Sequence, residues 1–421
     1  MENKSRNYKI PFICSLGACL EYFDFALFIF LLDPLRIVFF PEKENDLGFF
    51  LILVIFSSGY LMRPSGGFFF GHFGDKFGRK RAFQLSVTLM AIASIIIAFL
   101  PSATVAGGIA PIFLFMVRML QGFSVGGEIP GASVYASEFF SERRGLVIGL
   151  IFLGITWGNI LAIGLIGFIR LFMTSSEFLA YGWRICFLVG GLVGFLAFQL
   201  RMRFSETPVF REFKANKLKI PAQVLFNKSW KDVISGFFSV GTTATSLFIL
   251  VRLPEYLQDF IGVQFENIQV FSLFTFVVLG FGVVFFGFIS DYISRKILML
   301  VGSLLVILVS FFVLSFLDKG SSIGMVYLMT GILAFTLSIP NGVYACYILE
   351  KFPTLYRLSG LSICYNLGYA IFEGIFPLII TLVLTNNPSI VTVAYFISIP
   401  ALLSFLSSFF SNDYSKRHLK F

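Results

Sequence analysis

Long apolar runs separated by short charged segments dominate the chain. Segments such as Phe83–Leu100 and Ser321–Ile339 contain no charged residue and are apolar on all sides, as lipid-facing helices are. Transmembrane barrels instead show alternating strands of about ten residues, a pattern that this sequence lacks. Because backbone groups inside a bilayer must bond internally, the spans are expected to be helices. The sequence therefore predicts an all-α membrane protein.

Charge clusters and turn signals divide the chain into about twelve transmembrane helices of roughly twenty or more residues. The expected spans lie near 10–39, 48–71, 83–101, 108–138, 143–173, 181–201, 231–258, 268–290, 296–317, 322–350, 358–384 and 390–411. The longest polar stretch separates the sixth span from the seventh. We therefore predict an N-terminal six-helix bundle over 1–202, a cytoplasmic central loop over 203–230 and a C-terminal six-helix bundle over 231–421.

Composition and charge narrow the class of protein further. With 57% hydrophobic and 13% charged residues and a mean hydropathy of +0.88, the chain is too apolar for a soluble enzyme. The net charge of +9 does not indicate a nucleic-acid partner, because Lys and Arg gather in the gaps between apolar runs. The termini and even-numbered gaps hold 24 of them and the odd-numbered gaps 5. The positive-inside rule then predicts that both termini are cytoplasmic.

Neither the cysteines nor the histidines indicate a metal site. All five cysteines fall inside predicted spans, without the loop pairing of a disulfide framework or the spacing of a zinc site. The chain has only two histidines, His72 and His418. We therefore expect no bound metal.

A charged motif occurs twice, six spans apart. GHFGDKFGRKR at 71–81 follows the second span, and GFISDYISRK at 287–296 follows the eighth. The matching positions are Gly71, Asp75, Arg79 and Lys80 in the first copy and Gly287, Asp291, Arg295 and Lys296 in the second. An acid at a helix exit can pair with a base and with the N-terminal dipole of a neighbouring helix. Both copies are thus candidate cytoplasmic latches, and the alternative is a basic cluster that only sets topology. The second copy has Ser294 where the first has Gly78, which predicts a weaker latch.

Four motifs give the chain a family resemblance. They are LEYFDFALF at 20–28, LMRPSGGFFFGHFGDKFGRK at 61–80, RMLQGFSVGGEIPGASVYASE at 118–138 and YGWRICF at 181–187. With them the chain resembles the major facilitator superfamily, in particular the metabolite:proton symporters that include the proline/betaine, α-ketoglutarate, shikimate and citrate carriers. The resemblance implies two six-helix bundles that rock around a central site in a bacterial inner membrane. It also implies solute movement coupled to protons, no other cofactor, and function as a monomer.

The first span contains an acid pair inside the membrane. Glu21 and Asp24 are three residues apart and so lie on one helical face. Buried carboxylates of this kind can take up and release a proton as a cavity opens to alternate sides. The resemblance places the pair in the solute and proton pathway. The alternative is a static salt bridge with Arg118 or Arg63.

Two arginines lie inside predicted spans of the first half. Arg118 begins an R-x-x-Q-G pattern with Gln121, and a buried guanidinium costs a few kcal/mol unless it is paired. Its candidate partners are Glu128, Glu21 and Asp24. Arg63, in the second span, is either part of the same pathway or extends its side chain to the membrane surface.

Two charged residues depart from the family pattern in the second half. Arg252 precedes Pro254 in the seventh span, where relatives usually have a hydroxyl or small residue, and Glu373 stands in the eleventh span where Gly is common. We expect that they either pair across the cavity or recognise opposite ends of a carboxylated solute. A purely structural pair remote from lipid is the alternative.

Aromatic residues offer a weaker signal. Tyr22, Phe23, Phe25, Tyr135 and Trp157 can enclose a quaternary ammonium by cation–π attraction, but the chain has 57 Phe, so aromatic neighbours are expected everywhere.

These features together predict a proton-driven secondary transporter, and not an enzyme, that imports a small polar, carboxylated metabolite by alternating access. No phosphate-binding G-x-x-x-x-G-K-[ST] loop is present, which disfavours an ATP-driven pump. A proton-independent exchanger or uniporter, and a non-transporting receptor on the same fold, remain alternatives.

The predicted solute and proton pathway comprises Glu21, Asp24, Arg118, Gln121, Glu128, Arg252 and Glu373, with Arg63 as a second-span candidate. The predicted gate comprises Gly71, Asp75, Gly78, Arg79, Lys80, Asp291 and Arg295.

Overall fold

Helices form all of the regular structure in the described part of the chain. The computed structural model describes residues 9–41, 43, 45–77, 79–140, 142–202, 221–264, 268–386 and 388–415. Eleven helical segments in these ranges are long and apolar enough to cross a membrane, and Gln84–Phe99 is a shorter apolar helix. The prediction of an all-α membrane protein with about twelve spans is confirmed.

The first six spans occupy the N-terminal half. Their helices are α1 (Lys9–Phe30), α2 (Leu32–Phe39), α3 (Asn45–Phe77), α4 (Arg79–Phe99), α5 (Ala103–Ala106), α6 (Ile109–Val125), α7 (Glu128–Phe139), α8 (Arg144–Leu171), α9 (Ser175–Glu177), the π-helix η1 (Phe178–Gly182) and α10 (Trp183–Met202). Two predicted spans are interrupted, because the first divides into α1 and α2 at Leu31 and the fourth divides into α6 and α7 at Gly126 and Gly127.

The last six spans occupy the C-terminal half. Their helices are α12 (Pro221–Ile261), α13 (Ile268–Ile289), α14 (Arg295–Phe316), α15 (Ile323–Leu349), the 3₁₀ turn η2 (Thr354–Tyr356), α16 (Arg357–Tyr369), the π-helix η3 (Ala370–Ile375), α17 (Phe376–Asn386) and α18 (Ile390–Phe409). The backbone of Ser229 is not helical, so α12 bends there. Residues 221–228, which were predicted as part of the central loop, form a short helical segment before this bend.

Small residues let α3 and α6 pack with their backbones almost in contact. A Cβ atom at Gly122 would lie 1.7 Å from the carbonyl oxygen of Gly59, and one at Gly66 would lie 1.8 Å from that of Phe123. Only glycine fits at these positions, as at close helix crossings in other membrane proteins. This approach holds Arg63 of α3 and Arg118 of α6 inside the same bundle.

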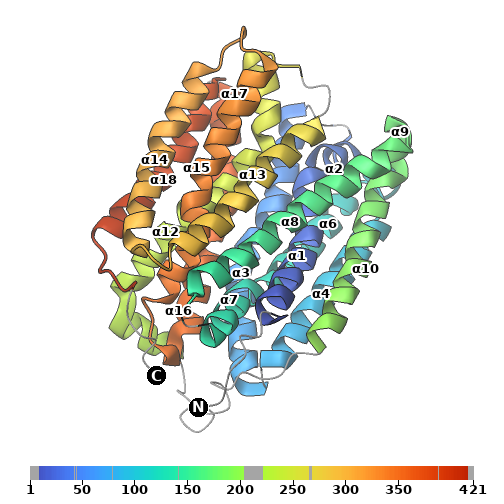
Figure 1. The fold of residues 1–421 in the computed structure, drawn as a ribbon. Coiled ribbons are helices and arrows are strands. Elements are labelled where there is room, and N and C mark those ends of the chain that lie inside the picture. The colour runs from blue at the N-terminus through green and yellow to red at the C-terminus, as the bar shows by residue number, and fades with distance from the viewer. Residues whose placement is uncertain are drawn as a thin grey trace.

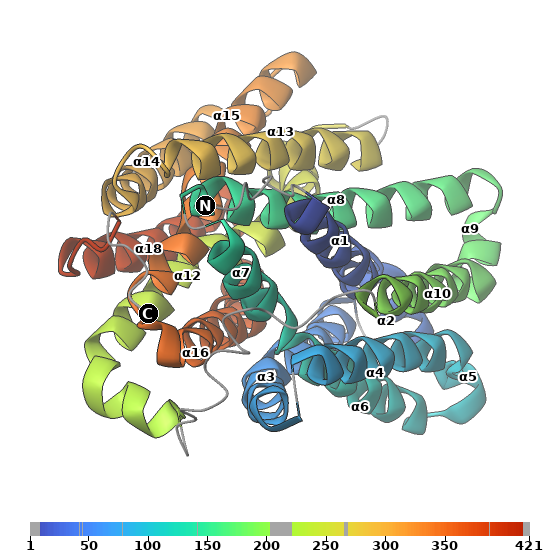
Figure 2. The same cartoon turned by 60° about the horizontal axis from the view of Figure 1, so that its bottom comes forward.

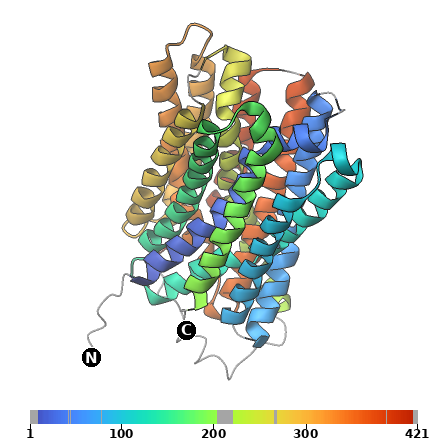
Figure 3. The same ribbon diagram turned by 90° about the vertical axis from the view of Figure 1, so that its right-hand side faces the viewer.

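The two halves lie side by side and meet along two seams (Figure 1). In one seam α8 of the N-terminal half packs against α13 of the C-terminal half, and in the other α3 packs against α16, η3 and α17. The view from below shows α8 and α13 as neighbours (Figure 2). The long helices run the length of the molecule together (Figure 3). The end that holds the α13–α14 connection is called here the predicted cytoplasmic end.

Candidate functional site

A chain of polar side chains runs through the interior of the N-terminal half. The Ser94 hydroxyl of α4 donates a hydrogen bond to Asp24 Oδ2 of α1. Ser94 Oγ accepts from Gln121 Nε2 of α6 at 2.7 Å, and Gln121 Oε1 accepts from Arg118 Nη1 at 3.0 Å. None of the four residues is more than 1% exposed. Asp24 and Arg118 are therefore connected through two neutral side chains.

Both ends of this chain keep free hydrogen-bonding atoms. Asp24 Oδ1 and the Nε and Nη2 atoms of Arg118 are buried without a hydrogen-bond partner. The Arg118 guanidinium instead lies over aromatic faces, with its Cζ 4.0 Å from the ring centre of Phe25 and 4.4 Å from that of Phe28. A buried ionic group that lacks partners is costly. A proton on Asp24, or a polar group of a solute beside Arg118, would reduce this cost.

The other predicted acids of this half are also buried. Glu21 lies one turn before Asp24 on α1 and is 3% exposed, and Glu128, the first residue of α7, is 1% exposed. Glu128 accepts a hydrogen bond from the Ser86 hydroxyl of α4. Among the three acids considered as partners of Arg118, Asp24 is the one that the Gln121–Ser94 chain links to it.

Arg63 lies in a cage of aromatic rings. It is fully buried in α3, so the alternative in which its side chain reaches the membrane surface is wrong. Its Cζ lies 4.2 Å from the ring centre of Tyr60, 4.5 Å from Phe25, 5.3 Å from Tyr369 and 6.0 Å from Tyr22. Three of these rings belong to the N-terminal half, and Tyr369 belongs to α16 of the C-terminal half. The Arg63 guanidinium therefore lies at the seam between the halves.

Glu373 faces the same seam from the C-terminal half. It lies in η3, and π-helical turns of this kind are frequent at functional sites. Its Oε1 accepts a hydrogen bond of 2.8 Å from the Tyr60 hydroxyl, while Oε2 is buried without a partner. Tyr60 thus places its ring against Arg63 and its hydroxyl against Glu373.

Arg252 is separate from this cluster. It forms an ion pair with Glu255 of the same helix and another, of 3.3 Å, with Asp33 of α2. Of the alternatives expected for Arg252 and Glu373, direct pairing is contradicted, because the ion pairs of Arg252 are with Glu255 and Asp33, whereas Glu373 bonds to Tyr60. The cation that faces Glu373 across Tyr60 is Arg63.

A small cavity, lined by both polar and apolar side chains, lies between the halves beside the aromatic cage. Its volume is about 30 Å³, enough for about one water molecule. Its polar lining comes from both halves and comprises Tyr22, Thr156, Asn159, Thr243, Ser246, Asn341 and Tyr369. The two halves are therefore closed around this part of the seam.

The second copy of the repeated motif ties the halves together at the predicted cytoplasmic end. Asp291 accepts hydrogen bonds from the backbone N–H groups of Gly145 at 2.7 Å and Leu146 at 3.0 Å, in the first turn of α8. It also forms an ion pair of 2.7 Å with Arg295. A carboxylate is favoured at a helix N-terminus by the free N–H groups and the helix dipole. The copy that the sequence predicts to be weaker forms a complete latch.

The first copy lies partly outside the described residues. Gly71 belongs to α3. Gly78 and the side chains of Asp75, Arg79 and Lys80 are not among the described parts of the chain.

Two further ion pairs join the halves next to the Asp291 latch. Arg144 at the start of α8 pairs with Glu350 after α15 at 2.7 Å, and Arg295 pairs with the same Glu350 oxygen at 3.0 Å. Arg357 at the start of α16 lies 3.9 Å from Glu138 at the end of α7. Each half therefore offers an arginine to an acid of the other half.

Similarity to known proteins covers most of the chain. A sequence profile described as the Major Facilitator Superfamily matches residues 14–357. The chain belongs to the major facilitator superfamily. It is therefore a multi-pass membrane transporter of a small-molecule solute, not an enzyme.

Relatives and solved structures of the superfamily extend this result. The proline/betaine transporter of Salmonella typhimurium is 28% identical over an alignment of 425 positions that covers 96% of this chain and 83% of that protein. The glycine betaine/proline/ectoine/pipecolic acid transporter of Dickeya dadantii is 30% identical over an alignment of 424 positions with the same coverage. The structure of the proton:xylose symporter XylE has a TM-score of 0.77 at 16% identity and covers 99% of this chain and 98% of its own. This last likeness shows the shared fold.

Several residues of the candidate site were not anticipated from the sequence. Glu138 and Glu350 precede Arg144 and Arg357 by six and seven residues, so an acid followed by an arginine at matching places in the two halves was a usable signal. Ser94 carries no such signal, because a serine in an apolar helix usually bonds its own backbone. Of the Arg63 cage, Tyr22 and Phe25 were among the aromatic residues that the sequence singled out, whereas Tyr60 and Tyr369 were hidden by the abundance of aromatic residues.

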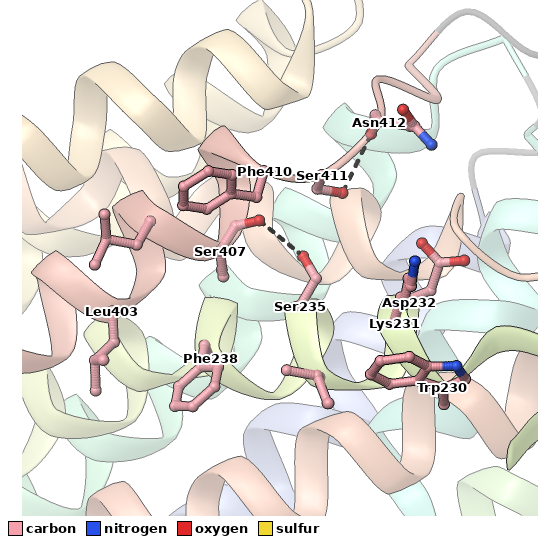
Figure 4. A pocket seen from close by; sticks show the side chains of 12 residues that line it. Trp230, Lys231, Asp232, Ser235, Phe238, Leu403, Ser407, Phe410, Ser411 and Asn412 are labelled. Carbon is pink, nitrogen blue, oxygen red and sulfur yellow. Dashed lines mark hydrogen bonds between the residues drawn. The ribbon is translucent and has the colours of Figure 1, made fainter.

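A second, larger pocket lies away from the seam, between α12 and α18 (Figure 4). Its volume is about 450 Å³, and its lining includes Trp230, Lys231, Ser235, Phe410 and Asn412. Trp230 is 52% exposed and Phe410 is 81% exposed, as expected for a surface groove.

Among the residues that the structure describes, no group of three or more His, Cys, Asp or Glu side chains is placed to hold a metal ion.

Proposed function

We propose that this transporter is a proton-coupled symporter that imports a small polar, carboxylated metabolite by alternating access between its two halves. The observation that carries the proposal is the buried chain from Asp24 through Ser94 and Gln121 to Arg118. Protonation of Asp24 removes the negative charge that accepts the Ser94 hydrogen bond. Ser94 and Gln121 are then free to reorient, so a proton on α1 changes the hydrogen bonding of Arg118 on α6.

A carboxylated solute suits the free atoms of the site. Arg63 and Arg118 together present buried guanidinium N–H groups without hydrogen-bond acceptors. The planar guanidinium matches a carboxylate with two parallel hydrogen bonds. Proline and betaine, which appear in the names of the relatives, both carry a carboxylate.

The orientation follows from the charge bias of the sequence. With 24 basic residues on one side and 5 on the other, the Asp291 latch faces the cytoplasm, and so do both termini. The membrane is then the bacterial inner membrane. One chain supplies both halves of the seam and its latch, so it functions as a monomer. The coupling ion is the proton, with no further cofactor and no nucleic-acid partner.

Uptake into liposomes tests the proposal. Labelled proline, betaine, α-ketoglutarate, citrate and shikimate are offered to the reconstituted protein with and without an inward proton gradient. Stimulation of one compound by the gradient is expected, and Asp24→Asn should abolish the stimulation while leaving counterflow exchange of that compound. Asp318→Asn, in an exposed turn between α14 and α15, is the matched control and should behave as the wild type.

Two results would favour the alternatives. Exchange that ignores the gradient in the wild-type protein indicates a proton-independent exchanger or uniporter. Binding of a panel compound without any flux indicates a receptor on the transporter fold.

A further inference from the structure

The groove between α12 and α18 reaches the boundary of the membrane. The apolar spans of the two helices are Lys228–Ile261 and Ile390–Phe409. Three of the lining residues, Trp230, Lys231 and Asn412, lie within three positions of the ends of these spans. This part of the groove therefore lies at the depth of lipid head groups.

The boundary in question is the one at the predicted cytoplasmic end. Lys296, which follows Arg295 of the latch, donates a hydrogen bond of 2.7 Å to the carbonyl oxygen of Ser411, another lining residue. The lipids nearest to the groove are thus those of the cytoplasmic leaflet.

The groove changes from polar to apolar along its length. Trp230 and Asn412 lie at one end, whereas Phe238 and Leu403 lie toward the other (Figure 4). Leu403 precedes the end of α18 at Phe409 by six residues, or about 9 Å along the helix. The groove therefore extends from the head-group region into the hydrocarbon region, where its side chains match an acyl chain.

The polar end contains one positive and one negative side chain. Lys231 and Asp232 carry the charges among the described residues of the lining. Lys231 is exposed, and its Nζ lies 5.6 Å from the ring centre of Trp230. Asp232 is half-buried, and a carboxylate accepts several hydrogen bonds at once, so partners within the protein leave room for a further donor. The pair suits a head group that carries both an anion and a cation.

The groove is open to the bilayer. Its apolar lining residues Trp230, Ile234, Leu406 and Phe410 are all exposed. Tryptophan is enriched at the head-group level of membranes because its ring is amphipathic. The volume of about 450 Å³ lies within the range of small-ligand pockets, about 300–1,000 Å³. It accommodates a head group and the upper part of one acyl chain.

We propose that this groove is a binding site for one molecule of phosphatidylethanolamine. The phosphate accepts hydrogen bonds from the Lys231 ammonium and the Asn412 amide, and the ethanolamine ammonium donates an N–H to Asp232. One acyl chain lies along Phe238 and Leu403. The site is separate from the solute pathway, so the inference stands or falls independently of the proposed function.

The charges of the groove disfavour other phospholipids. Phosphatidylcholine has a quaternary ammonium, which offers no N–H to Asp232. Phosphatidylglycerol has no cation at all, so its phosphate faces Asp232 without compensation. A free phosphate compound from the cytoplasm makes the contact with Lys231 but leaves the apolar part of the groove exposed.

Trp230 is a built-in reporter for this site, because bromine on an acyl chain quenches tryptophan fluorescence at short range. The chain has three tryptophans, and Trp183 is fully buried. In Trp157→Phe the tryptophan exposed to lipid is Trp230, and in the matched control Trp230→Phe it is Trp157 of α8, outside the groove. Both proteins are placed in phosphatidylcholine bilayers that contain a rising fraction of one brominated lipid.

Brominated phosphatidylethanolamine should quench Trp230 at about one fifth of the fraction that brominated phosphatidylcholine requires, the upper end for an exposed ion pair. Brominated phosphatidylglycerol should require at least as much as phosphatidylcholine. Trp157 should respond equally to all three lipids, because it reports the general lipid environment.

Two variants assign the preference to the charged pair. Asp232→Asn should make phosphatidylethanolamine and phosphatidylcholine equal at Trp230. Lys231→Gln should reduce the preference for phosphatidylcholine over brominated diacylglycerol, which has no phosphate, by about fivefold. Asp318→Asn and Lys319→Gln, in the exposed turn between α14 and α15, are the matched controls and should keep the wild-type order. Each ratio compares lipids within one variant, so a partial loss of folded protein does not imitate the effect.

Several results would overturn the site. Equal quenching of Trp230 by the ethanolamine and choline lipids would show an ordinary lipid-facing surface, and the same preference at Trp157 would show an effect of the whole bilayer. A preference for phosphatidylglycerol would indicate an anionic-lipid site instead. Unchanged ratios in Asp232→Asn, or no quenching of Trp230 by any lipid, would also refute the proposal.

Discussion

The Asp291 latch predicts that a change of one atom opens the predicted cytoplasmic end. In Asp291→Asn the side chain keeps its shape but loses its charge and one acceptor oxygen. Asp291 makes two hydrogen bonds to α8, and a hydrogen bond to a charged group contributes about 1.5–3 kcal/mol. Replacement by a neutral amide removes roughly half of the contribution of each of the two bonds. The closed state should therefore lose about 1.5–3 kcal/mol, which shifts the equilibrium toward the open state by roughly 10- to 150-fold.

Cys346 provides an internal reporter for this opening. It is fully buried in α15, one turn before Glu350, which pairs with Arg144 of the other half. With the other four cysteines replaced by alanine, the rate at which N-ethylmaleimide alkylates Cys346 follows the population of the open state. Asp291→Asn should raise this rate by the factor above. An unchanged rate, with Asp318→Asn as the control, would refute the latch as the element that holds this end closed.

Other predictions concern close packing. Gly145→Val should prevent closure and raise the rate of the same alkylation further, because even a Cβ atom there would lie 2.1 Å from Ser290 Oγ; a normal uptake rate would contradict this. Gly122→Ala should destabilise the protein by about 1–3 kcal/mol through its clash with the Gly59 carbonyl oxygen. Gly164→Ala, where no atom lies within 4 Å, should instead stabilise by roughly 0.5–1 kcal/mol. Thermal unfolding in detergent measures both changes. Equal shifts of the melting temperature in Gly122→Ala and Gly164→Ala would contradict close packing as the cause.

The spans could be predicted because length and hydropathy act on each segment independently. The predicted span at 268–290 matches α13 (Ile268–Ile289) within one residue. The interruptions of the first and fourth spans could not be predicted in this way, because they arise from tertiary contacts. The helix breaks at Gly126 and Gly127 where a Cβ at Gly126 would lie 2.2 Å from the Arg63 carbonyl oxygen of another helix. Likewise, the π-helical turn around Glu373 is not visible in the hydrophobic pattern.

The candidate site was predicted in its components but not in its connections. Asp24, Arg118 and Glu373 stand out because charged residues are rare in apolar spans. Which residues they meet depends on helix packing, and the pattern of apolar and charged residues along the chain does not reveal that packing. Direct pairing of Arg252 with Glu373, one of the alternatives expected, failed for this reason, because it assumed that two unusual charges in one half meet. The actual neighbour of Glu373 is Tyr60, which is 313 residues away in the chain.

The exchanged ion pairs at the latch make each half self-complementary. Arg144 and Glu138 of the first half correspond to Arg357 and Glu350 of the second, and each arginine pairs with the acid of the opposite half. If the first half met a copy of itself across a two-fold axis, its own arginine and acid would form the same two pairs. An isologous dimer of half-length chains therefore already possesses this closure chemistry. Fusion of two such chains would preserve the exchanged ion pairs. Each linked half would then be free to acquire charges of its own, such as Glu373 in the second half.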